Sequence, residues 1–415
     1  MRKNFILFIL VMAIVQLQAQ TKCYSSEYME QEIKNSALLK TRLAAIEAFM
    51  QQVLVSDFSN QRTDGSPSII KIPVVFHILY RTPEENISAE RVIMQLNALN
   101  RDFRRKNADS VKTPLAFLPF AADMEIEFFL ANRDPLGRST TGIERKYTPV
   151  KYWMADDKMK FNVNTGADAW DTKSYLNIWI CNMLDVLGYS TLPGTDITKD
   201  GVVLSFSSVS GNANIQSKVG RTLIHEVGHW LNLRHIWGDT YCGDDFVNDT
   251  PRQSTYTVGC FTEIRRTCGN TEAGDMYMNY MDFTDDGCMN LFTKGQKQRA
   301  RSLFETGGYR QSILFSKAFD EPEVFSSSLP EKFPQWLEIR LYPNPANSSI
   351  HINLEYDERW IGKEIQVLDM TGKIMLRKII TSTNQQMDVQ TLPAGIYFIR
   401  LQKEGEKIIK KFFKQ

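Results

Sequence analysis

Near its middle, the sequence reads His225-Glu226-Val227-Gly228-His229-Trp230-Leu231-Asn232-Leu233-Arg234-His235. Positions four apart share one face of a helix, so the imidazoles of His225 and His229 can bind the same metal ion. Glu226 then lies beside that ion, where it would take a proton from the water that the metal activates. His235 can join only if the chain turns first, and Asn232 tolerates the left-handed backbone that such a turn needs. Three imidazoles with one open position are typical of catalytic zinc, which predicts a zinc-dependent hydrolase.

The spacing makes this metal site a specific prediction. The chain has five histidines, and three of them fall in this one stretch. The alternative is a set of ordinary structural histidines beside a helical glutamate, and the position of the third histidine argues against it. We expect the other two, His77 and His351, to be half-buried residues of β-strands.

The N-terminus predicts export. Residues 1–4 are basic, residues 5–15 are apolar, and Ala19 offers a small residue for cleavage before Gln20. The apolar run is too short to cross a membrane comfortably, so we predict a signal peptide over residues 1–19 rather than an uncleaved anchor. A lipid anchor at Cys23 is disfavoured because the residues before it are not small and apolar. No other run is long and apolar enough to span a bilayer.

Charge and cysteine content narrow the class of protein. The chain has 49 basic and 48 acidic residues, and this balance argues against a nucleic-acid or anionic-membrane partner. Six cysteines in an exported chain favour disulfides. We expect Cys181 to be a buried thiol in a strand, whereas Cys23 stands alone near the mature N-terminus. The other four can pair in three ways and cluster in a loop-rich stretch: Cys242, Cys260, Cys268 and Cys288.

Hydrophobic periodicity divides the chain into several parts. Residues 20–61 predict a helical pro-segment, with a helix from Glu30 to Leu54, and a mixed α/β (α+β) domain follows over residues 62–322. We expect that domain to contain the strands Ile69–Tyr80, Met124–Leu130 and Ser174–Asn182, and the helices Ser88–Arg105 and Val219–Leu231. Thr293 and Gln296 predict a capping box for a last helix, which Gly307-Gly308 would end.

A Pro- and Ser-rich linker at residues 323–335 separates the last part, residues 336–415, which has the pattern of an all-β sandwich. Its expected strands are Ile350–Leu354, Glu364–Leu368, Lys373–Ile380 and Ile396–Leu401, with an edge strand at Lys407–Gln415. It has no cluster of acids, bases or metal ligands. It is therefore either an accessory β-domain or an export address.

The metal-binding stretch, with Ile236-Trp237-Gly238-Asp239 after it, resembles the pappalysin (cytophagalysin) family of metzincin zinc endopeptidases. The resemblance covers roughly residues 69–312. It implies an upper five-stranded sheet, an active-site helix and a lower irregular subdomain. It also implies that Asn279-Tyr280-Met281-Asp282 is a Met-turn, with Met281 as the hydrophobic floor of the metal site. From chemistry alone, Met281 would be assigned to the core.

Two positions depart from the family pattern. Asn232 replaces the usual glycine of the helix-ending turn, and we expect no loss of zinc from this change. Phe283 replaces a tyrosine that many metzincins carry near the zinc, so the metal or a backbone N–H must stabilise the developing oxyanion. The resemblance further implies that substrate lies extended along an edge strand near Leu187-Gly188-Tyr189-Ser190.

The same resemblance implies three further features of the site. It pairs Cys242 with Cys268 and Cys260 with Cys288. It implies a calcium site in residues 242–253, with Asp245, the backbone oxygen of Asn248 and Thr250 as ligands, although a solvated acidic turn is the alternative. Asp285 and Asp286 would line the pocket after the scissile bond and give a weak preference for Arg or Lys there. A solvated acidic turn is the alternative for this pair as well.

Latency is a further expectation. A secreted protease needs restraint before export, and we expect the Cys23 thiolate to occupy the open zinc position in the precursor. Some relatives use such a switch, whereas a spare or intermolecularly paired cysteine is the alternative. Cleavage between Asn60 and Thr63 would release the pro-segment, and Arg62 would suit self-cleavage if the basic preference holds.

The C-terminal part resembles the type A sorting domain of the bacterial type IX secretion system. The resemblance rests on Leu341-Tyr342-Pro343-Asn344-Pro345, Asp369-Met370-Thr371-Gly372-Lys373 and Leu392-Pro393-Ala394-Gly395-Ile396-Tyr397. It implies passage through the periplasm, contact with the secretion machinery, and a secreted or cell-surface protein.

Three functions compete. The first is a secreted zinc endopeptidase that cleaves extended protein or peptide substrates. The second is an inactive or adhesive surface-binding module that carries a zinc site, and the presence of Glu226 argues against it. The third is a zinc hydrolase of another class, such as an amidase, and the third histidine together with the Met-turn argues against it.

Overall fold

The computed structural model describes residues 23–59, 69–211, 220–261, 263–270, 273–320, 339–354, 360–382, 384–403 and 406–415. The chain forms two compact units that divide between Val324 and Phe325. The predicted signal peptide, the cleavage region at residues 60–63 and the linker at 323–335 lie outside the described residues. In the part of the chain that is described, no helix has the length and apolar character needed to cross a membrane.

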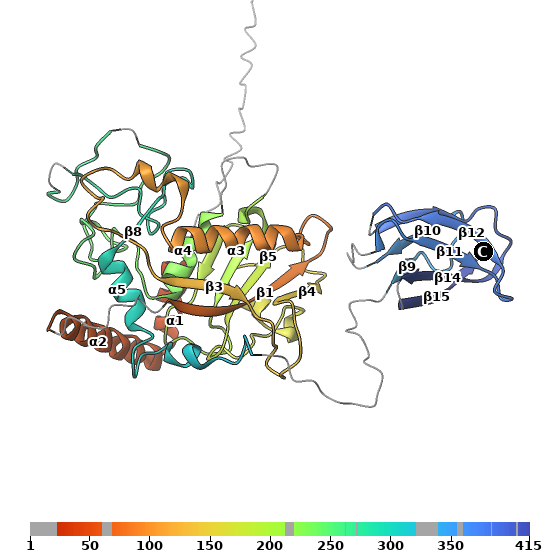
Figure 1. The fold of residues 1–415 in the computed structure, drawn as a ribbon, viewed down its shortest axis with the longest axis horizontal. Helices are drawn as coiled ribbons and strands as arrows, with labels where there is room; N and C mark the ends of the chain where they lie inside the picture. The colour runs from red at the N-terminus through yellow and green to blue at the C-terminus, as the bar shows by residue number, and fades with distance from the viewer. Residues whose placement is uncertain are drawn as a thin grey trace, which may run out of the picture. The chain divides into compact units, whose positions relative to one another are not determined.

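A six-stranded, mostly parallel sheet forms the frame of the first unit (Figure 1). Its strands are β1 (Ile70–Tyr80), β3 (Ile126–Leu130), β4 (Ile143–Tyr147), β5 (Leu176–Cys181), β6 (Gly188–Ser190) and β7 (Val202–Ser205), in the order β3-β1-β5-β7-β6. β4 is one strand more than the family resemblance implied. It fits because β3 pairs only with the first half of β1, which leaves Phe76–Tyr80 free to pair with β4. β6 is antiparallel to β7 and forms the edge of the sheet.

Two helices cover one face of this sheet, α3 (Ala89–Phe103) and α4 (Arg221–Trp230) (Figure 1). The hydroxyl of Ser88 caps α3, and Val92, Leu99 and Phe103 point into the core. Alternate residues of β1 face the opposite side of the sheet, where a second apolar cluster forms around Trp179 and Tyr189. The sheet is therefore buried on both faces, which explains the continuous apolar run of β1.

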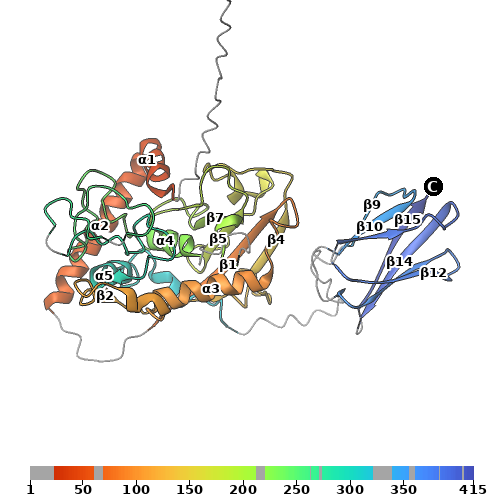
Figure 2. The same cartoon turned by 90° about the horizontal axis from the view of Figure 1, so that it is seen from above.

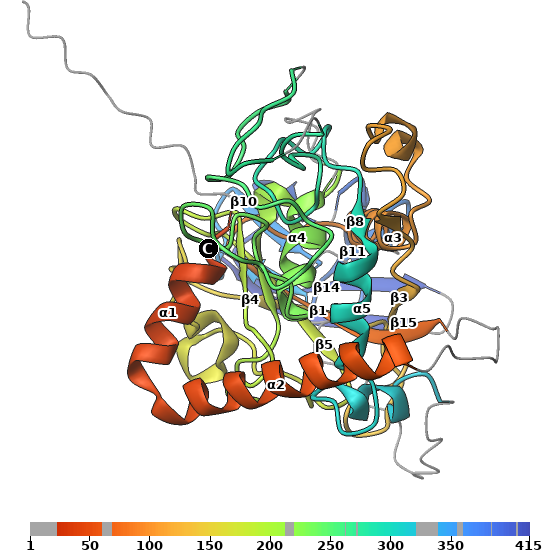
Figure 3. The same cartoon turned by 90° about the vertical axis from the view of Figure 1, so that its left-hand side faces the viewer.

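The pro-segment forms two helices, α1 (Ser25–Asn35) and α2 (Ala37–Ser59), rather than the single predicted one (Figure 3). Ser36 is extended and breaks the helix, and its hydroxyl accepts the backbone N–H of Leu39 at 3.1 Å. This N-cap restarts the helix in a new direction, which a periodicity argument over the whole segment does not detect. α2 packs against α5 (Lys294–Ser302), which follows the sheet in the chain.

The stretch between α4 and α5 is irregular until β8 (Phe292–Thr293), which pairs with β2 (Ala121–Ala122). Two disulfides hold it, Cys242–Cys268 and Cys260–Cys288, and both predicted pairings are confirmed. The capping box of Thr293 with Gln296 opens α5 as predicted, although α5 ends before Gly307-Gly308. Short 3₁₀ turns lie at η1 (Ala108–Lys112), η2 (Lys158–Lys160), η3 (Asn162–Asn164), η4 (Phe206–Ser208) and η5 (Gln311–Phe315).

The second unit is an all-β sandwich, as predicted (Figure 2). One sheet has the order β13-β10-β9 and the other β12-β11-β14-β15, so the Lys-rich last strand lies at an edge. Buried Trp360, Val367 and Ile399 belong to the core between them. The strands are β9 (Arg340–Tyr342), β10 (Ser349–Asn353), β11 (Glu364–Leu368), β12 (Ile374–Ile379), β13 (Asn384–Asp388), β14 (Gly395–Lys403) and β15 (Glu406–Lys414). His351 is half-buried in β10, as expected.

Candidate metal centre

Helix α4 carries the start of the site. The carboxylate of Asp286 accepts the backbone N–H groups of Gly220 and Arg221 at 3.2 and 3.1 Å, which caps the first turn of the helix. At the other end, Asn232 has φ +64, the left-handed conformation that the sequence predicted. The chain reverses there and brings His235 back beside the helix, because the left-handed residue ends the helical hydrogen bonding.

The three histidines converge on one point. The Nε2 atoms of His225, His229 and His235 lie 3.1, 3.1 and 3.2 Å from one another. Each Nδ1 has an acceptor of its own: the carbonyl of Tyr280 at 2.7 Å, the carbonyl of Leu233 at 2.9 Å and the carboxylate of Asp239 at 2.5 Å, respectively.

These outer bonds fix the chemistry of the inner nitrogens. When Nδ1 donates a proton outward, Nε2 keeps its lone pair, so three lone pairs face one another across the centre. Burial, followed by the charge of His235, lowers the pKa of His229 and keeps that imidazole neutral. Three tetrahedral zinc bonds would place the nitrogens about 3.3 Å apart, close to the observed spacing. The residues therefore fit a zinc ion.

Glu226 lies next to these ligands and is fully buried. Burial raises the pKa of its carboxyl from 4.5 to about 8, against the lowering effect of hydrogen bonds from Ser25 and Cys23. Oε2 accepts the hydroxyl of Ser25 at 2.8 Å. A carboxyl with a pKa near neutrality suits a group that must both accept and return a proton.

Met281 is fully buried, and its role as the hydrophobic floor of the metal site stays a prediction. A side chain at Gly228 would collide with the sulfur of Met281, so the helix can approach the Met-turn only through a glycine. The backbone of the same turn, at Tyr280, orients His225. The ring of Phe283 packs against His225 and His235, with centroids 5.6 and 4.9 Å away.

The pro-segment covers the centre. The Sγ of buried Cys23 and the ligand nitrogens of the three histidines all lie within 4.8 Å of one another. Next to it, the N–H of Tyr24 donates to the carbonyl of Gly188 at 3.1 Å, and the N–H of Ser190 donates to the hydroxyl of Ser25 at 2.8 Å. The pro-segment thus bonds to β6, the edge strand that the resemblance assigned to substrate. Burial, followed by the charge of Glu226, raises the pKa of the Cys23 thiol, whereas a cation among the imidazoles would favour the thiolate.

Two residues that contribute to the metal centre, Asp239 and Ser25, were not predicted from the sequence. Asp239 orients His235, and its other oxygen accepts the hydroxyl of Ser26 at 2.8 Å. A search for a group able to hold Nδ1 of the third histidine would have pointed to this acid, four residues later. Ser25 was missed because it contacts Glu226 across 201 positions of sequence.

Of the three predicted calcium ligands, Asp245 and Thr250 bond to each other, whereas Asn248 is exposed. The two oxygens of Asp245 accept the hydroxyl of Thr250 at 2.9 and 2.7 Å. Burial raises the pKa of the Asp245 carboxyl from 3.8 to about 7, against the lowering by hydrogen bonds from Thr250 and the N–H of Val247. Calcium binding at this loop stays a prediction.

The two predicted specificity residues have different surroundings. Asp285 is exposed, whereas Asp286 is half-buried and caps α4. Asp285 is the more exposed of the two, whereas Asp286 caps the helix, so Asp285 is the better candidate to meet a basic substrate side chain. The preference itself stays a prediction.

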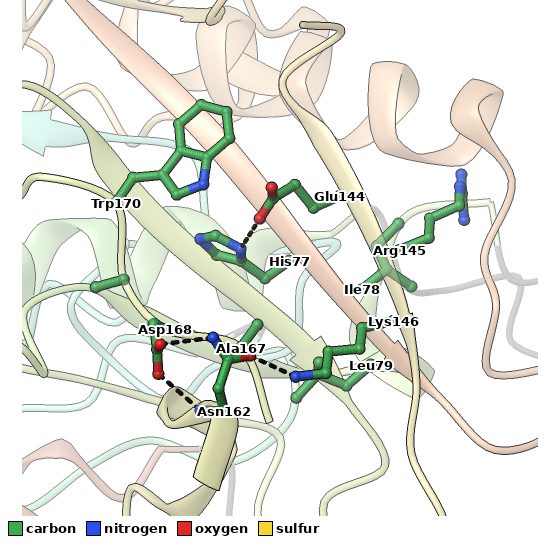
Figure 4. Close-up of a pocket in the computed structure, with 11 residues that line it drawn as sticks. His77, Ile78, Leu79, Glu144, Arg145, Lys146, Asn162, Ala167, Asp168 and Trp170 are labelled. Atoms are coloured by element: carbon green, nitrogen blue, oxygen red, sulfur yellow. Dashed lines mark hydrogen bonds and ion pairs between the residues drawn. The ribbon is translucent and has the colours of Figure 1, made fainter. Parts of the chain in front are cut away.

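A separate cavity of about 370 Å³ lies beside His77 and contains none of the predicted site residues (Figure 4). His77 is fully buried rather than half-buried, because the sheet is covered on both faces. Its ring nitrogens face Glu144 at 2.8 Å and Asn177 at 2.9 Å. These partners satisfy the imidazole, so the structural interpretation of His77 stands.

Comparisons with known proteins agree with this geometry. The family model described as pregnancy-associated plasma protein-A matches residues 160–305, which include the whole metal centre, and the model described as a secretion system C-terminal sorting domain matches residues 340–415. Mature mirolysin of Tannerella forsythia in complex with a cleaved peptide is 46% identical, with a TM-score of 0.59 over 62% of this chain and 99% of that chain. The chain belongs to the pappalysin family of metalloproteases.

Other relatives extend the likeness. A promirolysin mutant of Tannerella forsythia is 42% identical, with a TM-score of 0.65 over 73% of this chain and 99% of that one. An extracellular metalloprotease of Colletotrichum graminicola is 40% identical over 150 residues, or 34% of this chain and 52% of the relative. A second, from Aspergillus oryzae, is 27% identical over 72% of this chain and 96% of the relative. The chain spans about half the length of the first of these curated relatives.

These findings place the pappalysin outside the cell. The sorting domain at residues 340–415 and the extracellular relatives support a secreted or cell-surface protein. The likeness to a promirolysin over a larger share of the chain than to the mature form agrees with a pro-segment at the N-terminus. The fold is the predicted metzincin-like α/β domain followed by an all-β unit.

Proposed function

We propose that this pappalysin is a secreted zinc endopeptidase that hydrolyses peptide bonds of extracellular proteins. The observation that carries the proposal is the convergence of three Nε2 lone pairs beside the buried carboxyl of Glu226. An adhesive module would need the ligands but not the neighbouring acid. A structural zinc site would offer a fourth permanent protein ligand from the catalytic unit, whereas the fourth group here, Cys23, belongs to the pro-segment.

The residues of the chain have separate tasks in this reaction. His225, His229 and His235 would hold the metal, and Tyr280, Leu233 and Asp239 keep their rings oriented. Bound zinc supplies Lewis-acid activation of water and of the substrate carbonyl.

Glu226 accepts the proton of the attacking water and returns it to the leaving amine. The carbonyl of Gly188 and the N–H of Ser190, which now bond to the pro-segment, would bond to the backbone of an extended substrate. Substrate binding would therefore require the pro-segment to leave β6.

We propose further that Cys23 keeps the precursor latent as the fourth zinc ligand. Its Sγ lies among the three ligand nitrogens, and the N–H of Ser25 donates to that sulfur at 3.3 Å. The hydroxyl of Ser25 at the same time bonds to Glu226. The same short segment would thus occupy the metal position and engage the general base. Release would follow cleavage between Asn60 and Thr63.

The activity is tested by peptide-library cleavage with and without a zinc chelator, using the processed protein. Cleavage of internal peptide bonds that stops with the chelator and returns with zinc supports the endopeptidase. Hydrolysis restricted to non-peptide amides would indicate another class of hydrolase. Full zinc content without any hydrolysis would favour the binding module.

Latency is tested on the Glu226→Ala precursor, which cannot process itself. A thiol reagent should label neither Cys23 nor Cys181 while zinc stays bound, because both thiols are buried and Cys23 would also be a ligand. Cys181 serves as the internal control for unfolding. Fast labelling of Cys23 with zinc bound and Cys181 unreacted would rule out the switch.

The sorting unit has a proposed role of its own, contact with the type IX secretion machinery. Removal of residues 340–415 should retain the protein in the periplasm, measured by fractionation of the cells that produce it. Secretion of the truncated chain at the normal level would contradict this role.

A further inference from the structure

The pro-segment also holds the catalytic unit at a second place, away from Cys23. Arg299 of α5 is fully buried, and its Nη1 and Nη2 donate to the two carboxylate oxygens of Glu47 on α2, at 2.8 and 2.6 Å. Its Nε donates to the carbonyl of Asn232 at 2.9 Å. Arg299 thus forms a bidentate ion pair with the pro-segment and also bonds to the turn that connects the second and third zinc ligands.

A second guanidinium, that of Arg234, lies near Arg299. Arg234 and Arg299 both lie against the ring of Phe246, at 4.4 and 5.8 Å from its centroid. Nε of Arg234 is buried and has no hydrogen-bond partner among the described residues. The cations of Arg234 and Arg299 therefore lie close together, and the carboxylate of Glu47 binds to Arg299.

Other acids nearby do not replace Glu47. Asp245 bonds to Thr250 and to the N–H of Val247, and burial raises the pKa of its carboxyl to about 7. Asp244 pairs with exposed Arg252 at 2.9 Å. Release of the pro-segment thus removes the carboxylate from Arg299 while the like-charged neighbour stays. Two guanidiniums close together favour an incoming carboxylate.

We propose that in the processed enzyme Arg299 binds a carboxylate anion in the position that Glu47 occupies in the precursor, with Arg234 as a second cation nearby. The site rests on the proposed loss of the pro-segment but not on the peptidase reaction. A free small carboxylate and an acidic side chain of a bound protein offer the same chemistry.

The occupant would act on the metal centre through Asn232. That residue holds the left-handed turn before His235, its carbonyl bonds to Arg299, and its side-chain amide contacts the sulfur of Met50 in α2 at 2.9 Å. An anion that orders Arg299 would therefore also order the turn that positions the third zinc ligand. The site would link the binding of a carboxylate at Arg299 to the stability of the zinc-binding loop.

The first experiment locates the site in the uncut chain. In the Glu226→Ala precursor, Glu47→Ala removes the carboxylate and should lower the melting temperature. Added acetate should reverse at least half of this decrease, and the effect should saturate as the acetate concentration rises. Chloride at the same ionic strength should not reverse it. Glu47→Gln is the matched control, because the amide fills the space and leaves no room for acetate. Glu47→Ala combined with Arg299→Met should also lose the rescue.

The deciding experiment uses the processed, zinc-loaded enzyme. Acetate, and separately a synthetic peptide of residues 43–53, should raise its melting temperature with saturation, and Arg299→Met should abolish both shifts while zinc content stays unchanged. A response to acetate indicates a free anion as ligand, and a response to the peptide alone indicates an acidic side chain with apolar neighbours. If neither probe shifts the melting temperature, the proposal is overturned even if Glu47→Ala is rescued. Peptide cleavage is not part of the readout, so this failure is distinct from failure of the proposed protease function.

Discussion

The metal centre, which includes Asp239 and the Met-turn at residues 279–283, lies next to the rest of the stretch from Thr240 to Cys288, here called the stapled loop, but the two are held together differently. At the centre, the Nδ1 atom of each imidazole has its own hydrogen-bond acceptor, and Met281 and Glu226 are fully buried. The stapled loop contains no helix or strand among its described residues. It depends on two disulfides and on carboxylates that accept several local hydrogen bonds, such as Asp275 with Thr267.

The difference has an energetic meaning. In a buried centre no water can replace a lost hydrogen-bond partner, so we expect a substitution there to have a large effect on function. In the loop, the two disulfides and several local hydrogen bonds each contribute part of the stability. The loss of one of them therefore lowers stability or affinity by a limited amount. We therefore expect the effects of substitutions to fall from the centre outward across the loop.

The largest effect is expected for Glu226→Ala. Loss of a general base costs about 10²–10⁴-fold in rate, so we expect peptide turnover to fall by at least about 10²-fold while zinc content stays near one ion per chain. Glu263→Ala makes the same chemical change at an exposed position of the stapled loop and should leave turnover unchanged. If Glu226→Ala keeps turnover within a factor of about ten, a loss under about 1.4 kcal/mol of barrier, the assignment of the base is wrong.

Removal of a staple should lower stability and spare the chemistry. Cys260→Ala with Cys288→Ala opens a link across 28 positions, and the loss of such a link costs about 2–4 kcal/mol. We expect the melting temperature to fall by several degrees, with kcat/KM at 25 °C within about threefold of the parent. Cys181→Ala, which removes a buried thiol but no disulfide, is the control for lost packing. A fall in kcat comparable to that of Glu226→Ala would erase the distinction between centre and loop.

Asp245 should give a smaller effect that depends on pH. Its pKa is raised by burial from 3.8 to about 7, so its contribution to stability is fully present below about pH 3.8 and is lost as the pH rises through about 7. Asp245→Asn should flatten this part of the stability profile. If calcium binds at this loop, it would hold the ionised carboxylate, and at pH 8 calcium should raise the melting temperature by about 2–4 °C while zinc content is unchanged. Equal profiles with and without calcium would support a turn that binds no ion.

Local patterns in the sequence predicted the centre well, because its parts depend on short spacings. Each of these features depends on residues that are only a few positions apart: the spacing of the histidines, the turn at Asn232, the cap at Ser88 and the capping box at Thr293. The contacts of the pro-segment could not be predicted in this way. Glu47 and Arg299 are 252 positions apart, and nothing near either residue marks the other.

The errors in the predicted elements have the same origin. Strand β4 carries the polar residues Glu144, Arg145 and Lys146, so its strand character comes from pairing with β1 and not from its composition. The break at Ser36 depends on one hydroxyl that caps α2, within a segment whose apolar period continues. His77 is buried on account of the layers on both sides of the sheet, which its own strand does not reveal.

The smallest effect is expected for substrate preference, at the outer end of the stapled loop. Asp285 is exposed next to the Met-turn, so its charge is screened by water and would favour Arg or Lys after the scissile bond by less than about tenfold. Asp285→Asn should reduce this preference in the peptide library and leave turnover of neutral substrates unchanged. Asp244→Asn, another exposed acid of the loop, is the matched control. Asp286→Asn is a different case: it weakens the cap on α4, so we expect a lower melting temperature before any change in specificity. If the cleavage sites of the parent enzyme show no enrichment of Arg or Lys, Asp285 has no role in specificity. If Asp285→Asn lowers all cleavage tenfold or more, the loop takes part in the chemistry itself.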